Sequence, residues 1–325
     1  MLANAVTFVL GLAALVAGAE VMVRGGTKIA SRLGISAIVV GLTVVSIGTS
    51  TPELAIGVVA ASEGSGEMAV GNIAGANVIN LLFVLGLSAL IRPLAIQMRT
   101  LRMELPVMAG AAMLLWLLAA DSVLSRVDGL ILVTGAIGYT CAVVWAARRE
   151  TPDVADEFAG AYASRETRLD SGRRTAVDIG MTLGGIAIIV LGAQLLVDAA
   201  VDMAREFHVS DALIGLTVVA IGTTAPELVT TVVSTLRGER DIAIGNLLGS
   251  SMYNTLLILG VICLVPAHGL ELPRELVRVD IPIMVAATLV CIPIFVSGRR
   301  VRRIEGAAMV TAYVAFLVFV LVTQS

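Results

Sequence analysis

Long runs of apolar residues, separated by short polar stretches, recur along the whole chain. A helix needs about 20 apolar residues to cross a bilayer, and by that measure the chain holds ten candidate spans. They cover approximately residues 2–23, 35–60, 68–91, 104–120, 127–147, 175–199, 212–236, 242–264, 277–297 and 304–323. The pattern therefore predicts an all-α polytopic membrane protein with ten transmembrane helices.

Composition supports this class. Of the 325 residues, 58% are apolar and 14% are charged, which leaves too few polar side chains to cover a soluble body of this size. The longest polar stretch, 148–174, is interpreted as a cytoplasmic linker between a first half, 1–147, and a second half, 175–325. No cleavage motif follows the first apolar run, so we interpret that run as a retained helix.

The basic residues predict the orientation. Lys and Arg accumulate on the cytoplasmic side of short loops, and 18 of the 22 lie in one set of alternate loops. The remaining four are Arg126, Arg205, Arg274 and Arg278. We therefore expect a multi-pass protein of the cell membrane with both termini outside.

The chain repeats itself at an offset of 174 residues. Residues 41–54 and 215–228 agree at eleven of fourteen positions, GLTVVSIGTSTPEL against GLTVVAIGTTAPEL. At the same offset, residues 69–86 and 243–260 agree at eight of eighteen. The repeating unit is a half of five spans, and an odd number of spans inverts the second copy in the membrane. Inverted repeats of this kind bind substrate near the midplane, between discontinuous helices.

Four of the spans carry helix-breaking or polar residues near their middle. Spans two, three, seven and eight contain glycines together with a proline or with amide and hydroxyl groups. We expect these spans to be helices with broken or unwound centres.

Two glutamates lie inside apolar spans at matching repeat positions. Glu53 and Glu227 each follow a proline, which cannot donate a backbone hydrogen bond and so releases a carbonyl about one turn earlier. A buried glutamate can be neutral and structural, but ionisable residues at membrane depth are costly and are usually functional. The matching pair favours a functional site.

Neutral oxygen donors accompany the two glutamates. Seven polar residues in these spans have two candidate roles, of which contact with the ion is favoured and hydrogen bonding between helices is the alternative. They are Thr49, Ser50, Asn80, Thr223, Thr224, Ser250 and Asn254. For Asn72 and Asn246 the two roles are evenly balanced. Because all donors are oxygens, with no histidine or thiolate, the set suits hard cations such as calcium and sodium rather than zinc or copper.

These motifs resemble a known family. GTSTPEL with GNIAGANVIN, followed by GTTAPEL with GNLLGSSMYN, is similar to the two signature repeats of the calcium/cation antiporter superfamily, and most similar to its sodium/calcium exchanger branch of ten-helix prokaryotic members. The resemblance covers both halves. It implies alternating access, in which spans one and six slide across a core of spans two, three, seven and eight.

The resemblance also implies a ligand set. Glu53 and Glu227 would hold calcium in competition with sodium. The hydroxyls named above and the backbone carbonyls of Ser46 and Ala220 would complete calcium or sodium sites. Asn80, Ser250 and Asn254 would line the same cavity, with the transported ions as substrates and no cofactor.

The chain departs from the family pattern at two positions. Ala76 stands where the first repeat usually carries a serine, and Asn254 stands where many exchangers have an aspartate. The number of sodium ions bound, and the preference for sodium itself, therefore stay open.

Other functions were weighed against sodium/calcium exchange. A proton- or potassium-coupled cation exchanger is the nearest alternative, since glutamates that are protonated in turn would suffice. A calcium channel fits inverted, broken repeats less well. No enzyme motif is present, and the chain's only histidines, His208 and His268, fall in predicted loops. Nothing indicates nucleic-acid binding.

Overall fold

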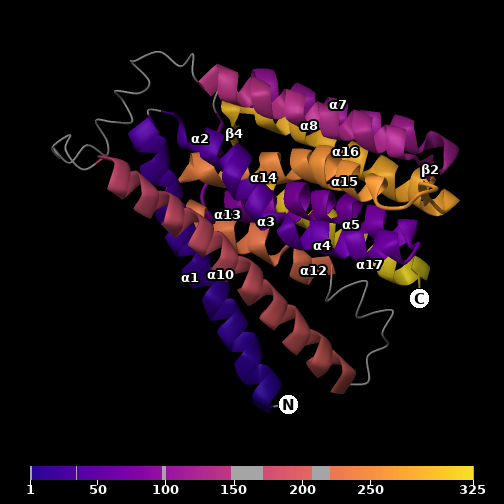
Figure 1. Ribbon diagram of the computed structural model, residues 1–325, viewed down its shortest axis with the longest axis horizontal. Coiled ribbons are helices and arrows are strands. Elements are labelled where there is room, and N and C mark those ends of the chain that lie inside the picture. Colours follow the sequence, from indigo (N-terminus) through magenta and orange to yellow (C-terminus); the bar gives the residue numbers. More distant parts are fainter. Residues whose placement is uncertain (1, 34, 97–99, 148–170, 207–219, 325) are drawn as a thin grey trace. The chain divides into compact units, whose positions relative to one another are not determined.

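The computed structural model describes residues 2–33, 35–96, 100–147, 171–206 and 220–324, and helices dominate it (Figure 1). The chain divides into two compact units, and each unit takes residues from both halves of the sequence. The first consists of Met1–Thr49 and Gly138–Gly249, and the second of Ser50–Ile137 and Ser250–Ser325.

The first unit contains the two longest helices. Its elements are α1 (Leu2–Leu33), α2 (Ala37–Val40), the π-helical η1 (Gly41–Val45), α3 (Ser46–Thr49), α10 (Ser171–Glu206), α12 (Ala220–Thr223) and α13 (Ala225–Arg237), together with parts of α8 (Arg126–Ala147) and α14 (Arg240–Tyr253).

Helices α1 and α10 pack along each other through glycines (Figure 1). A Cβ on Gly18 would lie 2.8 Å from the carbonyl oxygen of Gly185, and a Cβ on Gly11 would lie 2.9 Å from that of Gly192. Only glycine permits backbones to approach this closely, as in other membrane helix pairs. The contacts run in opposite sequence directions, so the two helices are antiparallel. Since α1 and α10 are equivalent elements of the two repeats, this is the relation that inverted repeats require.

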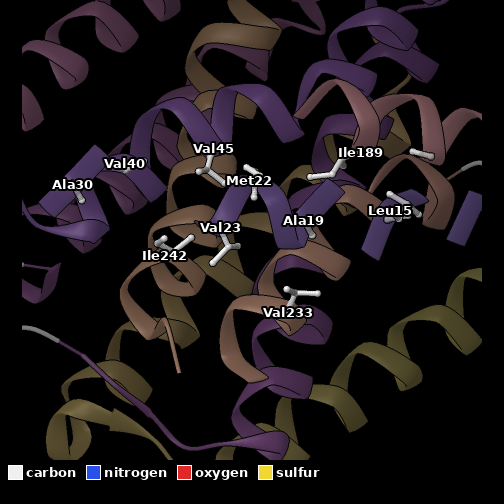
Figure 2. Close-up of a cluster of buried hydrophobic side chains, with 12 residues drawn as sticks. Leu15, Ala19, Met22, Val23, Ala30, Val40, Val45, Ile189, Val233 and Ile242 are labelled. Atoms are coloured by element: carbon white, nitrogen blue, oxygen red, sulfur yellow. The ribbon is translucent and has the colours of Figure 1, made fainter. Parts of the chain in front are cut away.

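An apolar cluster joins α1 to the other helices of the first unit (Figure 2). Leu15, Met22 and Val23 of α1 are buried among side chains such as Val45 and Val233. These contacts are apolar, and they connect α1 with η1 and α13.

The second unit is built from shorter elements. Its helices are α4 (Thr51–Ser62), α5 (Gly66–Val78), η2 (Ile79–Val84), α6 (Leu85–Ile91), η3 (Thr100–Glu104), α7 (Leu105–Leu118), η4 (Ala119–Asp121), η7 (Asn254–Ile258), α15 (Leu259–Leu264), η8 (Leu276–Asp280), α16 (Ile281–Val296), η9 (Ser297–Arg299) and α17 (Arg303–Gln324). Its strands are β1 (Leu94–Ala95), β2 (Val123–Leu124), β3 (Leu270–Glu271) and β4 (Arg300–Val301).

The four strands have two residues each and form two antiparallel pairs. β1 pairs with β4, with Leu94 opposite Val301, and β2 pairs with β3, with Leu124 opposite Leu270. The first pair joins two arginine-rich loops, and the second joins two loops from the arginine-poor set. Loops that the charge pattern assigns to one side therefore meet within this unit.

Seven helices among the described residues are long and apolar enough to cross a membrane, and a bent pair supplies an eighth span. The seventh expected span, 212–236, begins outside the described residues, and its described part is α12 and α13. The tenth expected span corresponds to α17. Each of the ten expected spans thus coincides wholly or partly with helix. The chain is an all-α polytopic membrane protein.

Two of the four spans expected to be broken are broken. In span two, α3 and α4 meet at Ser50 and the span bends by 42°. In span seven, α12 and α13 meet at Thr224. Pro52 and Pro226 lie in the first turn of the second helix of each pair, where a proline is tolerated because the first turn has no helical hydrogen-bond partner for its nitrogen.

The expectation was wrong for spans three and eight. Helix continues without interruption over Gly66–Ile91 and Arg240–Leu264, because neither span contains a proline. Each instead includes a π-helical segment, η2 or η7, at equivalent repeat positions. Such segments are inserted mostly at functional sites.

The helices expected for spans one and six were also too short. Apolar residues stop near 23 and 199, whereas α1 extends to Leu33 and α10 covers Ser171–Glu206. A helix does not end at a polar side chain as long as its backbone hydrogen bonds are satisfied. The length of the apolar stretch therefore indicates the part of the helix that crosses the bilayer, and not the length of the whole helix.

Candidate ion-binding site

The two glutamates occupy equivalent places in the backbone. Glu53 lies in the first turn of α4 and Glu227 in the first turn of α13. The residues before these helices, Ser50 and Thr224, share nearly the same conformation, with φ/ψ of −84°/12° and −85°/−1°. Both glutamates therefore lie just after the break in their spans.

The polar side chains that the sequence indicated are buried. Glu53 and Glu227 are 0% exposed. The neutral members are at most 3% exposed, namely Ser46, Thr49, Ser50, Asn80, Thr223, Thr224, Ser250 and Asn254. Ala220, named for its carbonyl, is the first residue of α12. The glutamate, hydroxyl and amide side chains therefore face the protein interior rather than lipid.

The set is divided between the two units. The first unit holds Glu227 with Ser46, Thr49, Ala220, Thr223 and Thr224. The second holds Glu53 with Ser50, Asn80, Ser250 and Asn254. Each unit thus holds one carboxylate and several neutral oxygens. One boundary between the units falls at the helix break, between Thr49 and Ser50.

In the first unit, Asn246 joins two helices. The hydroxyl of Thr49 donates to Oδ1 of Asn246 at 3.1 Å, and Nδ2 of Asn246 donates to the hydroxyl of Thr231, also at 3.1 Å. Both amide atoms are therefore engaged, which favours the helix-joining role for Asn246. Thr231 was not singled out from the sequence, although it lies one helical turn after Glu227.

The hydroxyl of Ser46 also joins two helices. It lies 2.5 Å from the carbonyl of Gly41 on its own span and 3.2 Å from the carbonyl of Asn246 on α14. Gly249 packs directly against this hydroxyl. The side chain of Ser46 is thus used in packing, and only its carbonyl is a candidate ligand.

In the second unit, two equivalent asparagines have buried amide oxygens without a partner. Asn80 lies in η2 and Asn254 in η7, and both are 0% exposed. Among the described residues, nothing pairs with either amide atom of Asn80 or with Oδ1 of Asn254. Leaving a buried amide oxygen unpaired costs about 1–3 kcal/mol, and a bound cation would remove that cost.

Asn77 is a buried polar residue that the sequence analysis did not single out. Its Nδ2 donates to the hydroxyl of Thr255 at 2.9 Å, and its Oδ1 faces Nδ2 of Asn254 at 3.5 Å. Asn77 lies three residues before Asn80 on the same continuous helical span, Gly66–Ile91. Ala76, where a serine was expected, is 3% exposed on the same helix.

Glu20 forms an ion-pair cluster with two arginines. Its carboxylate lies 2.5 Å from Arg24 one turn later on α1, and it also pairs with Arg237 at the end of α13. No group of three or more His, Cys, Asp or Glu side chains that could hold a metal occurs among the described residues.

Comparison with known proteins agrees with the motifs. The family model described as sodium/calcium exchanger protein matches residues 3–145 and 177–322. A putative antiporter, CaxA of Alkalimonas amylolytica, is 34% identical over 97% of this chain and 98% of its own length. The sodium/calcium exchanger MaX1 of Methanosarcina acetivorans is 30% identical over 97% of each chain.

A solved structure has the same fold. The sodium-calcium exchanger NCX_Mj, soaked with 2.5 mM Na⁺ and 10 mM Sr²⁺, superimposes with a TM-score of 0.82 and is 26% identical, covering 97% of each chain. Its likeness extends over both halves of the chain.

Proposed function

The chain belongs to the sodium/calcium exchanger protein family, and we propose that it exchanges calcium for sodium across the cell membrane by alternating access. The observation that carries the proposal is the matched pair of buried asparagines, Asn80 and Asn254, whose amide oxygens lack partners among the described residues. Hard cations prefer such oxygens. A membrane-buried set of oxygens with two carboxylates suits ion binding and transfer.

The roles proposed for the residues follow from their chemistry. Glu53 and Glu227 supply the two formal charges that balance one calcium ion. Neutral contacts come from the hydroxyls of Thr49, Ser50, Thr223, Thr224 and Ser250, the amides of Asn80 and Asn254, and the carbonyls of Ser46 and Ala220. The ions are substrates, and the exchange requires no cofactor.

Competition between the ions follows from charge balance. Two carboxylates are neutralised by one calcium ion or by two sodium ions, and holding both at once would place excess positive charge in a low-dielectric interior. Binding of one ion therefore favours release of the other. This exclusion is the basis of exchange.

The proposed movement involves α1 and α10, the glycine-packed pair, as one body. The close backbone contacts between them hold the two helices together, whereas the contact of α1 with residues such as Val45 and Val233 is apolar. Apolar surfaces without directional bonds can slide with little loss of energy, whereas the ion pair of Glu20 with Arg237 would have to open during the movement. We propose that this sliding exposes the site to each side in turn, with both termini outside.

Calcium uptake into proteoliposomes tests the proposal. Vesicles loaded in turn with sodium, potassium or acid are diluted into medium containing labelled calcium. We expect only an outward sodium gradient to drive uptake above equilibrium. Uptake driven by potassium or by pH alone would favour the alternative, a potassium- or proton-coupled exchanger. The absence of a hydroxyl at Ala76 is the departure from the family pattern that motivates this comparison. Calcium flux that runs only downhill and needs no counter-ion would indicate a channel.

A further inference from the structure

The side-chain amide of Asn77 contacts three residues within the second unit. Its Nδ2 lies 2.9 Å from Oγ1 of Thr255 and 3.5 Å from the sulfur of Met284, and its Oδ1 lies 3.5 Å from Nδ2 of Asn254. All four side chains are at most 3% exposed. The contacts come from α5, η7 and α16, which are far apart in sequence.

The neighbours of Asn77 determine which way its amide points. The hydroxyl of Thr255 has one proton, which it donates to the carbonyl of Ser251 at 3.0 Å. Toward Asn77 it can therefore only accept. The thioether of Met284 has no proton and can also only accept. The atom of Asn77 that faces both must be the NH₂ group, whose two protons match the two acceptors.

The orientation of the Asn77 amide determines the orientation of the Asn254 amide. With its NH₂ group held by Thr255 and Met284, Asn77 turns its Oδ1 toward Asn254. An oxygen of Asn254 at that place would repel it, so Asn254 presents Nδ2 there. Oδ1 of Asn254 is then turned the other way, where no described residue pairs with it.

The orientation of Asn254 matters because a cation binds the oxygen of an amide and not its NH₂ group. Building on the function proposed above, we propose that Asn77 is a positioning residue, which orients the amide of Asn254 so that its oxygen faces the transported cation. Asn77 does not itself touch the ion. It acts through Asn254, and Thr255 and Met284 hold Asn77 in place.

The arrangement also bears on the choice of residue at position 254. An ionised aspartate at position 254 would place a carboxylate oxygen next to Oδ1 of Asn77. Both atoms are hydrogen-bond acceptors, so they would repel each other. The surroundings of position 254 thus fit an amide.

Substitution of Thr255 tests the orientation without touching a proposed ligand. Thr255→Val removes the acceptor that holds Asn77 but leaves Asn77 and Asn254 in place. We expect calcium to bind about fivefold more weakly, the effect of losing roughly one neutral contact. Thr255→Ser keeps the hydroxyl and should bind as the wild type does. Calcium titration calorimetry on the purified full chain measures the affinities.

Thr182→Val is the matched control. Thr182 is also buried and also donates to a carbonyl four residues earlier, that of Asp178, at 2.9 Å. The two valine variants therefore lose the same type of helical bond, and only Thr255→Val loses a contact to Asn77. Equal calcium affinities for the two valine variants would overturn the proposal.

A double-mutant cycle separates positioning from general stability. If Asn77 acts through Asn254, then Asn77→Leu should weaken calcium binding in the wild type but add nothing in an Asn254→Ala background. Additive losses would show that Asn77 acts by another route. Wild-type protein that binds neither calcium nor sodium would refute the proposed function itself. Normal wild-type binding with additive losses would refute only the role of Asn77.

Discussion

The guanidinium group of Arg32 lies 2.5 Å from the carboxylate of Asp178 and joins the end of α1 to the beginning of α10. The two residues are 146 positions apart. The side chain of Asp178 is 4% exposed and that of Arg32 is 32% exposed. The pair closes one end of the glycine-packed helix pair with a charged contact that is partly shielded from water.

Asp178→Asn should lower the thermal stability of the purified protein. The substitution leaves the charge of Arg32 without its counter-charge in a partly buried place, which costs about 2 kcal/mol. Unfolding in detergent, followed by circular dichroism, measures the change. Arg24→Gln is the control, since the side chain of Arg24 is 56% exposed and its pair with Glu20 should contribute less. Equal melting temperatures for the two variants would contradict the expectation.

Glu53→Gln and Glu227→Gln should each reduce calcium exchange to background while the protein stays folded. Each variant removes half of the formal charge that balances a divalent ion, yet the amide keeps the shape of the side chain. Labelled calcium flux in proteoliposomes and melting temperature are measured together. Glu104→Gln, which changes another buried glutamate in η3, serves as the control. Near-normal flux in either site variant would remove that glutamate from the ligand set.

Ala76→Ser should make the sodium dependence of calcium efflux tighter or steeper and leave calcium affinity nearly unchanged. Two carboxylates balance two sodium ions, so a third sodium must be held by neutral oxygens, and a serine adds one. The equivalent position in the second repeat already carries Ser250. Ala74→Ser, two residues earlier on α5 and equally buried, is the control.

The voltage response of Ala76→Ser gives a second measurement. Carrying an additional charge through the membrane couples transport to about 2.3 kcal/mol per 100 mV. A larger number of sodium ions per cycle would therefore steepen the dependence of exchange on membrane potential. Unchanged sodium and voltage dependence would mean that position 76 does not face the ion path.

Cysteine labelling in intact cells should give opposite results at two positions outside the described residues. Ser164→Cys, in the linker 148–174, should be protected from an impermeant thiol reagent, and Ser325→Cys should be labelled. The background carries Cys141→Ala, because Cys141 is exposed, whereas Cys263 and Cys291 are buried. The reverse pattern would invert the orientation proposed from the arginines.

Much of the site was predictable because its residues are tied to local sequence signals. A proline cannot continue the hydrogen-bond ladder of the preceding turn, so Pro52 and Pro226 indicated the helix breaks that place Glu53 and Glu227 at helix N-termini. The absence of a proline in spans three and eight was an equally local signal. The prediction of a break in these two spans gave more weight to their glycines and amides. In the structure, these residues lie in helices that contain a π-helical segment and are not broken.

The sequence by itself determined the membrane class, the repeat and the residue types of the candidate ion site, because each depends on neighbouring residues or on self-similarity at one offset. Only the tertiary structure decided the partners of buried polar groups. Asn77 meets Thr255, and Arg32 meets Asp178, from segments more than 140 residues away. The energy of a buried hydrogen bond or ion pair depends on which group the fold brings within about 3 Å, and no local pattern in the chain specifies that group.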